Sequence, residues 1–371
     1  MIIPYTILKG EKYMKKVMSL VLAGSMMMGL AACGGSSSSS TTAAATTAAA
    51  GGGAAAETQA AASGPAYDKL NIKFSYATGD TGMDGVTAIK FEELVEEKSG
   101  GAIQVDRYPN CQLSGGDMQR HVEMMVAGGA FEMAIISETS FNVIDNDFYA
   151  NALLFANPTY EDMYKNFDGE LGKYIGTVYE KYNIKYFYTL PNGIQHLTDN
   201  KRPIHTVADM KDLKMRAYGD TQMKMQRAMG ADPVNMSFSE LYSALQTGTV
   251  DGQTNGYQTM WSASFQEVQK YVCECGIICS AYDILADKRQ WDKWSPDTQA
   301  LIDECAHEAA LYARQYMNDQ EAMCKQAFLD AGCEIYVPTA EELQTFKDAV
   351  QPVNDEIMTL LSPECIKALG L

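Results

Sequence analysis

Arg216 is the residue whose sequence context points most clearly to ligand binding. It stands in the run LKMRAY (213–218), where apolar residues alternate with polar ones. In a short strand this alternation buries the apolar side chains on one face and leaves Arg216 on the other, near the strand's end. A guanidinium can hold a carboxylate through two parallel hydrogen bonds. The pattern therefore predicts a carboxylate anchor, and the alternative is a surface salt bridge with Asp220 or Asp199.

The stretch 237–255 (SFSELYSALQTGTVDGQTN) places a capped helix, a sharp stop and a polar loop in one order. Ser237 and Glu240 have the spacing of a capping box, and Gly248 is a typical residue to end the helix. Residues 250–255 then predict a short strand that delivers Asp and Asn side chains to a turn. Such a loop supplies groups that can hydrogen-bond to a ligand, and it contains no pattern typical of catalysis.

Nothing in the sequence marks an enzyme or a metal site. The four histidines show no HExxH spacing, and the chain contains neither GxSxG nor GxxxxGK[ST]. The cluster CECGIIC (273–279) lacks C-x-x-C spacing and a nearby histidine, which favours small buried residues over zinc ligands. Cys324 and Cys333 could pair, although the sequence does not define the connectivity. We therefore expect no catalysis, no metal and no cofactor.

The N-terminus has the order of features that export requires. A basic pair (15–16) precedes an apolar stretch (17–32) that is too short to span a bilayer, and the motif LAAC ending at Cys33 resembles a lipoprotein signal-peptidase site. We expect residues 1–32 to be a signal peptide and Cys33 to carry lipid that anchors an extracytoplasmic protein to the cell membrane. The alternative is an ordinary buried helix beside a disordered tail.

Residues 33–66 are rich in Ser, Thr, Ala and Gly, with almost no large apolar side chains, and they predict a disordered tether. Loss of residues 1–32 removes four Lys and one Glu, which leaves 25 basic and 46 acidic side chains and a net charge of −21. This balance argues against nucleic acid and against an anionic membrane surface as partners.

Strand and helix patterns alternate from about residue 70 onward. Alternating apolar residues predict a strand over 70–76, and an amphipathic helix follows it before a glycine pair. The pattern predicts an α/β fold of parallel sheets covered by helices, with ligands bound beyond the carboxyl ends of the strands. The remaining length of about 300 residues suits two lobes better than one small core. Further strands are expected at 103–105, 133–136, 185–190, 213–217 and 250–253.

The longest predicted helix begins at Ser295 and Pro296 and runs without Pro or Gly to Ala331. At about 1.5 Å per residue its length is about 50 Å, which exceeds the width of one lobe. It should therefore brace both lobes. The expected division is 67–192 plus 281–320 for lobe I, and 193–280 plus 321–371 for lobe II.

Three motifs in order, LKMRAYGD (213–220), the capped helix with its DGQTN loop, and FQEVQKYV (265–272), resemble the solute-binding proteins of tripartite ATP-independent periplasmic (TRAP) transporters, the DctP-like family. The resemblance runs from about Leu70 to near the C-terminus. It implies a two-lobed periplasmic-binding-protein-like fold with a long helix along both lobes. It also implies a monomeric receptor that captures a small organic acid and delivers it to small and large ion-coupled membrane subunits.

The resemblance implies roles for individual residues. The Arg of the family's K-x-R motif binds the ligand carboxylate and matches Arg216. Asn255 matches the Asn that ends the DGQxN motif, which implies a hydrogen bond to the same carboxylate or to a neighbouring hydroxyl. Phe238 matches an aromatic residue that packs on the ligand. The alternatives are a turn residue for Asn255 and simple core filling for Phe238.

Gln195 departs from the family pattern. Members that bind acidic sugars carry a second Arg in an N-G-x-R motif, whereas this chain reads NGIQ. A neutral amide adds no second positive charge, so doubly charged ligands are disfavoured unless His196 or Arg202 supplies one. Tyr76 and Glu138 are placed by analogy at the mouth of the lobe I strands, where they would contact ligand hydroxyls.

Three functions follow from these features. The first is a TRAP-type receptor for a small organic acid. The second is a binding lipoprotein that serves an ABC importer or a sensor kinase, which a neighbouring ATPase gene would favour. The third is an exported enzyme, although the sequence shows neither a nucleophile nor a base in a recognisable pattern.

Overall fold

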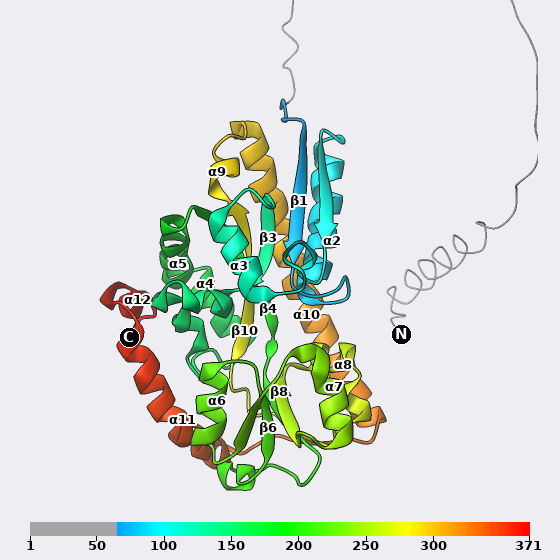
Figure 1. Cartoon of the computed structure of the whole chain (residues 1–371), viewed down its shortest axis with the longest axis vertical. Coiled ribbons are helices and arrows are strands. Elements are labelled where there is room, and N and C mark those ends of the chain that lie inside the picture. Colours follow the sequence, from blue (N-terminus) through cyan, green and yellow to red (C-terminus); the bar gives the residue numbers. More distant parts are fainter. Residues whose placement is uncertain (1–64) are drawn as a thin grey trace, which may run out of the picture. The chain divides into compact units, whose positions relative to one another are not determined.

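The computed structural model describes residues 65–371, and it folds them into two α/β lobes, each built on one mixed sheet (Figure 1). The expected two-lobed α/β fold is therefore confirmed. The predictions for residues 1–32, for Cys33 and for nearly all of the tether lie outside the described residues.

Lobe I contains a five-stranded sheet in the order β2-β1-β3-β10-β4. β1 runs parallel to β2 and β3, and β10 runs antiparallel to both of its neighbours. One face of the sheet packs on α2 and α10 through a core that includes Phe74, Phe91 and Ile302. The strands are β1 (Leu70–Tyr76), β2 (Ile103–Tyr108), β3 (Met133–Ser137), β4 (Ile184–Ile194) and β10 (Cys279–Asp287).

Lobe II contains a six-stranded sheet in the order β11-β9-β5-β8-β6-β7. β6 runs parallel to β7 and β8, whereas β5 runs antiparallel to β8 and β9. The strands are β5 (His196–Asp199), β6 (Lys214–Ala217), β7 (Asp232–Asn235), β8 (Gly252–Asn255), β9 (Tyr271–Cys273) and β11 (Glu334–Tyr336).

The two antiparallel strands explain why the expectation of parallel sheets is wrong. β5 enters lobe II directly from β4, and β10 enters lobe I from β9, so each starts at the edge that faces the other lobe. The remaining strands of each sheet end at that edge. The carboxyl ends of β6 and β8, and the start of β5, consequently meet between the lobes.

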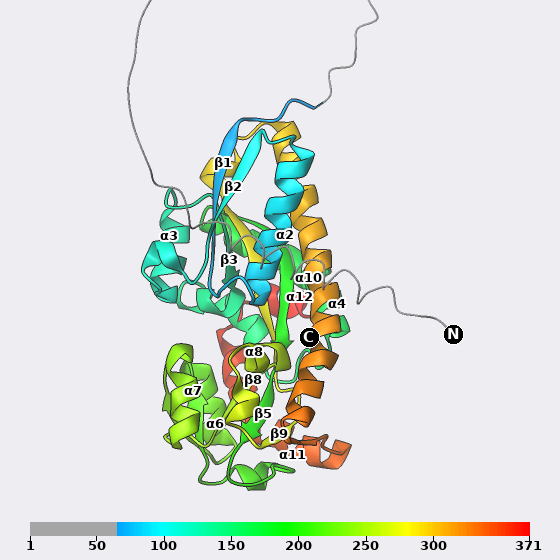
Figure 2. The same ribbon diagram turned by 90° about the vertical axis from the view of Figure 1, so that its right-hand side faces the viewer.

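Helix α10 (Pro296–Asp330) spans both lobes, as its length predicted. Its N-terminal part packs on α2 of lobe I, and its C-terminal part packs on α8 of lobe II, where Cys324 and Phe328 join the core (Figure 2). The Ser295 hydroxyl caps the helix by accepting a hydrogen bond from the Thr298 backbone N–H. A rigid element of this length ties the two lobes together along one side.

The C-terminal helices contact both lobes, and the expected division of the chain between the lobes stays a prediction. α11 packs on α6 of lobe II and on the turn Asn146–Ala152 of lobe I, and α12 packs on α5. The other bounds are α2 (Met83–Lys98), α3 (Met118–Ala127), α4 (Tyr160–Phe167), α5 (Glu170–Lys181), α6 (Asp220–Ala228), α7 (Phe238–Thr247), α8 (Tyr257–Ser262), α9 (Lys288–Trp291), α11 (Ala340–Leu360) and α12 (Pro363–Ala368), with 3-10 turns at Gln112–Ser114, Glu138–Val143, Asn146–Ala152, Val207–Met210 and Phe265–Glu267.

Two chain segments cross between the lobes, one from β4 to β5 and the other from β9 to β10, and backbone hydrogen bonds join them. The Gln195 backbone N–H donates to the Ile278 carbonyl at 2.8 Å, and the Ile277 N–H donates to the Gln195 carbonyl at 3.0 Å. Beside this pair, Gly193 has a φ of +96°, and a Cβ added to it would lie 3.1 Å from the Gly256 Cα. Glycine is therefore required where the connection passes the end of β8.

Candidate ligand-binding site

Arg216 lies at the carboxyl end of β6 and is only 4% exposed. Its Nε donates to the Met236 carbonyl at 3.3 Å, and the Tyr218 ring centre lies 4.7 Å from its Cζ. Within residues 65–371 no carboxylate lies at ion-pair distance from this guanidinium. Asp220 pairs instead with Lys224 at 2.9 Å, and Asp199 accepts from the backbone of the 199–202 turn, so the salt-bridge alternative has no support.

Burial lowers the pKa of Arg216 to about 10, because a charge without a counterion is costly in a low dielectric. The group still carries its proton at neutral pH. A guanidinium has five N–H donors, and only the Nε–H has a partner among the described residues. The arrangement is a buried cation with a free bidentate fork, which suits an anion arriving from outside.

The DGQTN motif is mostly structural. Asp251 accepts from the Lys214 backbone N–H at 2.8 Å and pairs with the Lys201 Nζ at 2.7 Å, which joins β8 to β6. The fully buried Gln253 side chain donates to the Thr198 hydroxyl at 2.9 Å and accepts from the Asn255 amide. Only Asn255 reaches the edge where β6 also ends, and its role toward a ligand stays a prediction.

Gln195 lies at the same edge, immediately before β5. Its Nε2 donates to the Tyr218 hydroxyl at 3.1 Å and to the Ser280 hydroxyl at 2.6 Å, while its Oε1 accepts from the Gln222 amide at 3.1 Å. The structure thus brings Gln195 close to Arg216 through Tyr218. Tyr218 was not predicted from the sequence, although its place two residues after Arg216 was a signal that could have marked it.

The two possible second cations do not accompany Arg216. His196 is buried, its Nδ1 accepts from the Gly276 N–H at 3.3 Å, and burial lowers its pKa to about 4, so it is neutral. Arg202 donates to the carbonyls of Asp209 and Lys211, in the segment that leads to the start of β6. Neither residue adds positive charge at the carboxyl end of that strand.

The aromatic candidates have different surroundings. Phe238, the first residue of α7, is 42% exposed, and its ring centre lies 5.7 Å from that of Phe265. Tyr76, the last residue of β1, is buried. Its hydroxyl donates to Asp80 at 2.5 Å and accepts from Arg107 at 3.0 Å, so its polar tip is already occupied.

Glu138 directly follows the carboxyl end of β3 in lobe I, and its role toward a ligand stays a prediction. It is fully buried, and neither of its carboxylate oxygens has a hydrogen-bond partner among the described residues. It faces Asp283, whose carboxylate accepts from the Tyr179 hydroxyl at 2.7 Å and the Thr189 hydroxyl at 2.6 Å. Burial, reinforced by the Asp283 charge, raises the pKa of Glu138 well above its usual range.

We expect Glu138→Gln to make the protein more stable at alkaline pH and to flatten its pH dependence. A carboxyl with a raised folded-state pKa contributes stability below its unfolded pKa of about 4.3, and this contribution is lost as pH rises toward the folded pKa. The wild type should therefore weaken as the pH rises above about 4.3, and the amide should weaken less, because only Asp283, whose pKa burial raises to about 7, still titrates there. Urea unfolding across this range measures the difference. The exposed Glu341→Gln is the control, and parallel profiles for wild type and Glu138→Gln would contradict the expectation.

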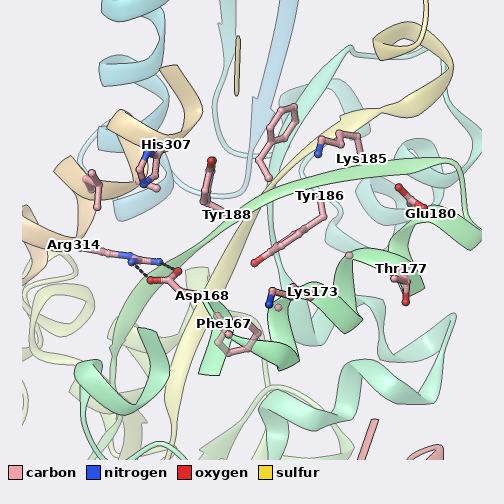
Figure 3. Close-up of a pocket in the computed structure, with 16 residues that line it drawn as sticks. Phe167, Asp168, Lys173, Thr177, Glu180, Lys185, Tyr186, Tyr188, His307 and Arg314 are labelled. Carbon is pink, nitrogen blue, oxygen red and sulfur yellow. Dashed lines mark hydrogen bonds and ion pairs between the residues drawn. The ribbon is translucent and has the colours of Figure 1, made fainter. Parts of the chain in front are cut away.

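A groove of about 580 Å³ lies elsewhere, on lobe I between α5, β4 and α10 (Figure 3). Figure 3 shows Arg314 directed at Asp168, and two hydrogen bonds of 2.7 Å join them. Arg314 also stacks on the Tyr164 ring at 4.3 Å. Because its arginine is neutralised and no predicted site residue lines the groove, we place the candidate site at Arg216.

Residues 65–371 were also searched for metal-binding clusters, disulfides and membrane-spanning helices. No group of three or more His, Cys, Asp or Glu side chains in this part of the chain is arranged to hold a metal ion. Its eight cysteines are buried and free, including Cys324, Cys333 and the CECGIIC cluster. None of the helices described is both long and apolar enough to cross a membrane.

Comparison with known proteins identifies the family. The profile of the bacterial extracellular solute-binding protein family 7, DctP, matches residues 74–359. The C4-dicarboxylate-binding periplasmic protein DctP of Rhodobacter capsulatus is 31% identical over 313 residues, which cover 83% of this chain and 93% of that protein. The 2,3-diketo-L-gulonate-binding periplasmic protein YiaO of Escherichia coli K12 is 28% identical over 299 residues, covering 78% and 88%.

A solved structure agrees with this assignment. A TRAP periplasmic solute-binding protein from Ochrobactrum anthropi, with its C-terminus bound in the ligand pocket, superposes with a TM-score of 0.76 at 28% identity and covers 82% of this chain and 94% of its own. These relatives are binding proteins that serve transport, which excludes the enzyme alternative. The chain belongs to the DctP family of extracytoplasmic solute-binding proteins of TRAP transporters.

Proposed function

We propose that this chain is a TRAP receptor for a small monocarboxylate that bears hydroxyl or keto groups, such as an aldonic, uronic or 2-oxo acid. The observation that carries the proposal is the buried Arg216 guanidinium, which has no acidic partner among the described residues. A ligand carboxylate would neutralise it through two hydrogen bonds. The relatives named above, which carry the names of a C4-dicarboxylate and a diketogulonate binder, support a small organic acid.

A single cation favours one carboxylate over two. Gln195 is a neutral amide, His196 is uncharged, and Arg202 bonds to carbonyls in another segment. A second carboxylate buried without a cation retains most of its desolvation cost, which amounts to several kcal/mol even after relaxation. The ligand is then handed to the membrane subunits. We further propose a monomer held at the membrane by lipid on Cys33 and by the tether that follows it.

A thermal-shift screen tests the ligand class. A ligand at a hundred times its Kd adds about 2.7 kcal/mol of stability, so a cognate acid should give a clear rise in Tm. Monocarboxylates with hydroxyl or keto groups should stabilise the wild type more than succinate or malate. Gln195→Arg should shift the preference toward dicarboxylates, because it adds a second guanidinium. If succinate or malate stabilises the wild type more than every monocarboxylate tried, the single-anchor proposal is wrong.

A further inference from the structure

The Gln195 side chain has no donor left for a ligand. Both N–H groups of its amide are used, by Tyr218 and Ser280, and its oxygen accepts from Gln222. A carboxamide offers two donors and one acceptor oxygen. These three partners come from the loop after β6, from the start of β10 and from α6. Gln195 therefore acts on the site by fixing the position of its neighbours.

Tyr218 is the neighbour that Gln195 holds beside the anchor. Its ring centre lies 4.7 Å from the Arg216 Cζ, a distance at which a guanidinium is attracted to an aromatic face. Its hydroxyl accepts the Gln195 N–H at 3.1 Å, and that hydroxyl proton has no acceptor among the described residues. The side chain is 46% exposed, although the arginine beneath it is only 4% exposed. Tyr218 thus combines an accessible surface with one unused donor next to a buried cation.

We propose that Tyr218 determines specificity, by donating its hydroxyl proton to an oxygen on the carbon next to the ligand carboxylate. This inference rests on the proposed function, since it requires a carboxylate on Arg216. The stacked ring holds the guanidinium in one orientation. The hydroxyl binds an oxygen on the ligand carbon next to the carboxylate. Acids with a 2-oxo or 2-hydroxy group satisfy the donor. Acids without that oxygen leave the donor unpaired once the bound ligand covers Tyr218, and an unpaired buried polar group opposes binding.

Matched acid pairs test this role in the full-length protein. The probes are pyruvate against propionate, 2-oxoisovalerate against isovalerate, and gluconate against 2-deoxygluconate, each measured by calorimetry. The wild type should favour the oxygenated member of its best pair at least tenfold. Tyr218→Phe keeps the ring and removes only the hydroxyl, so it should reduce this ratio to threefold or less. Its affinity for the member without the oxygen should stay within twofold of the wild type.

Three further variants separate this inference from its alternatives. Tyr242→Phe removes a hydroxyl that bonds to Glu267 on the same lobe, and it should leave the ratio unchanged. Gln195→Met should weaken the preference as well, because it releases Tyr218. Arg216→Ala should weaken binding of both members by at least about thirtyfold. If Tyr218→Phe keeps the wild-type ratio while Arg216→Ala weakens binding to that extent, the Tyr218 role is wrong and the receptor function stands. If Arg216→Ala leaves binding intact, the proposed function itself fails.

Discussion

Arg216→Ala should weaken binding of the cognate acid by at least about thirtyfold and leave the fold intact. Loss of one partner of a buried charge pair costs about 2 to 5 kcal/mol, which corresponds to a factor of about 30 to several thousand. No acidic side chain of the described residues depends on Arg216, so its removal leaves no unpaired carboxylate in the empty protein. Calorimetry gives the affinity, and circular dichroism with thermal melting reports on the fold.

Two substitutions serve as controls for this result. Arg227→Ala removes an exposed arginine from α6 in the same lobe, so it should change the affinity less than twofold. Arg216→Lys keeps a positive charge but cannot form two parallel hydrogen bonds to a carboxylate, so we expect an intermediate loss of affinity. A change of less than fivefold for Arg216→Ala would exclude this residue as the anchor.

Gly252→Ala should destabilise the protein by about 3 kcal/mol, near the upper end of the cost of overpacking. Gly252 opens β8, where it is paired with Asp199 of β5 and Met215 of β6. A Cβ at this position would lie 2.0 Å from the Thr198 carbonyl oxygen and 2.9 Å from the Met215 Sδ. Backbone cannot move aside as a flexible side chain can, so the strands would have to separate.

Urea unfolding measures this effect. Gly79→Ala is the matched control, because a Cβ added there would meet only the Asn110 Oδ1, at 3.9 Å. An unfolding free energy for Gly252→Ala within 1 kcal/mol of the wild type would show that β5 and β8 adjust more freely than their spacing implies.

Local patterns predicted the helices well because helix ends depend on neighbouring residues. The box between Ser237 and Glu240 and the one between Thr339 and Glu342 both form, since each joins residues three apart. α10 matches its prediction for the same reason, with Ser295 as its cap. The strand expected at 250–253 lies instead at Gly252–Asn255, because its pairing with the distant β5 sets its ends.

In the candidate site, too, the features that depend on neighbouring residues were predictable and those that depend on distant residues were not. Alternation within LKMRAY is local, and it placed Arg216 at the end of a strand on the face opposite the core. The network around Gln195 joins residues that are 23 to 85 positions apart in the chain, so no single stretch of sequence reveals it. Glu138 was placed at the mouth of the lobe I strands by analogy, and it does follow the carboxyl end of β3, but its complete burial and the charge of the distant Asp283 cannot be read from the local sequence.

The position of β10 has a consequence for the order of folding. β3 and β4 flank β10 and have no hydrogen bonds to each other, so the lobe I sheet stays split until a strand formed about 85 residues after β4 becomes available. A nascent or translocating chain that ends before Cys279 exposes two open strand edges, which are prone to intermolecular pairing. Late closure by β10 means that lobe I is completed only after strands β5 to β9 of lobe II have been synthesised. It also means that lobe I cannot be produced by cutting the gene at one point.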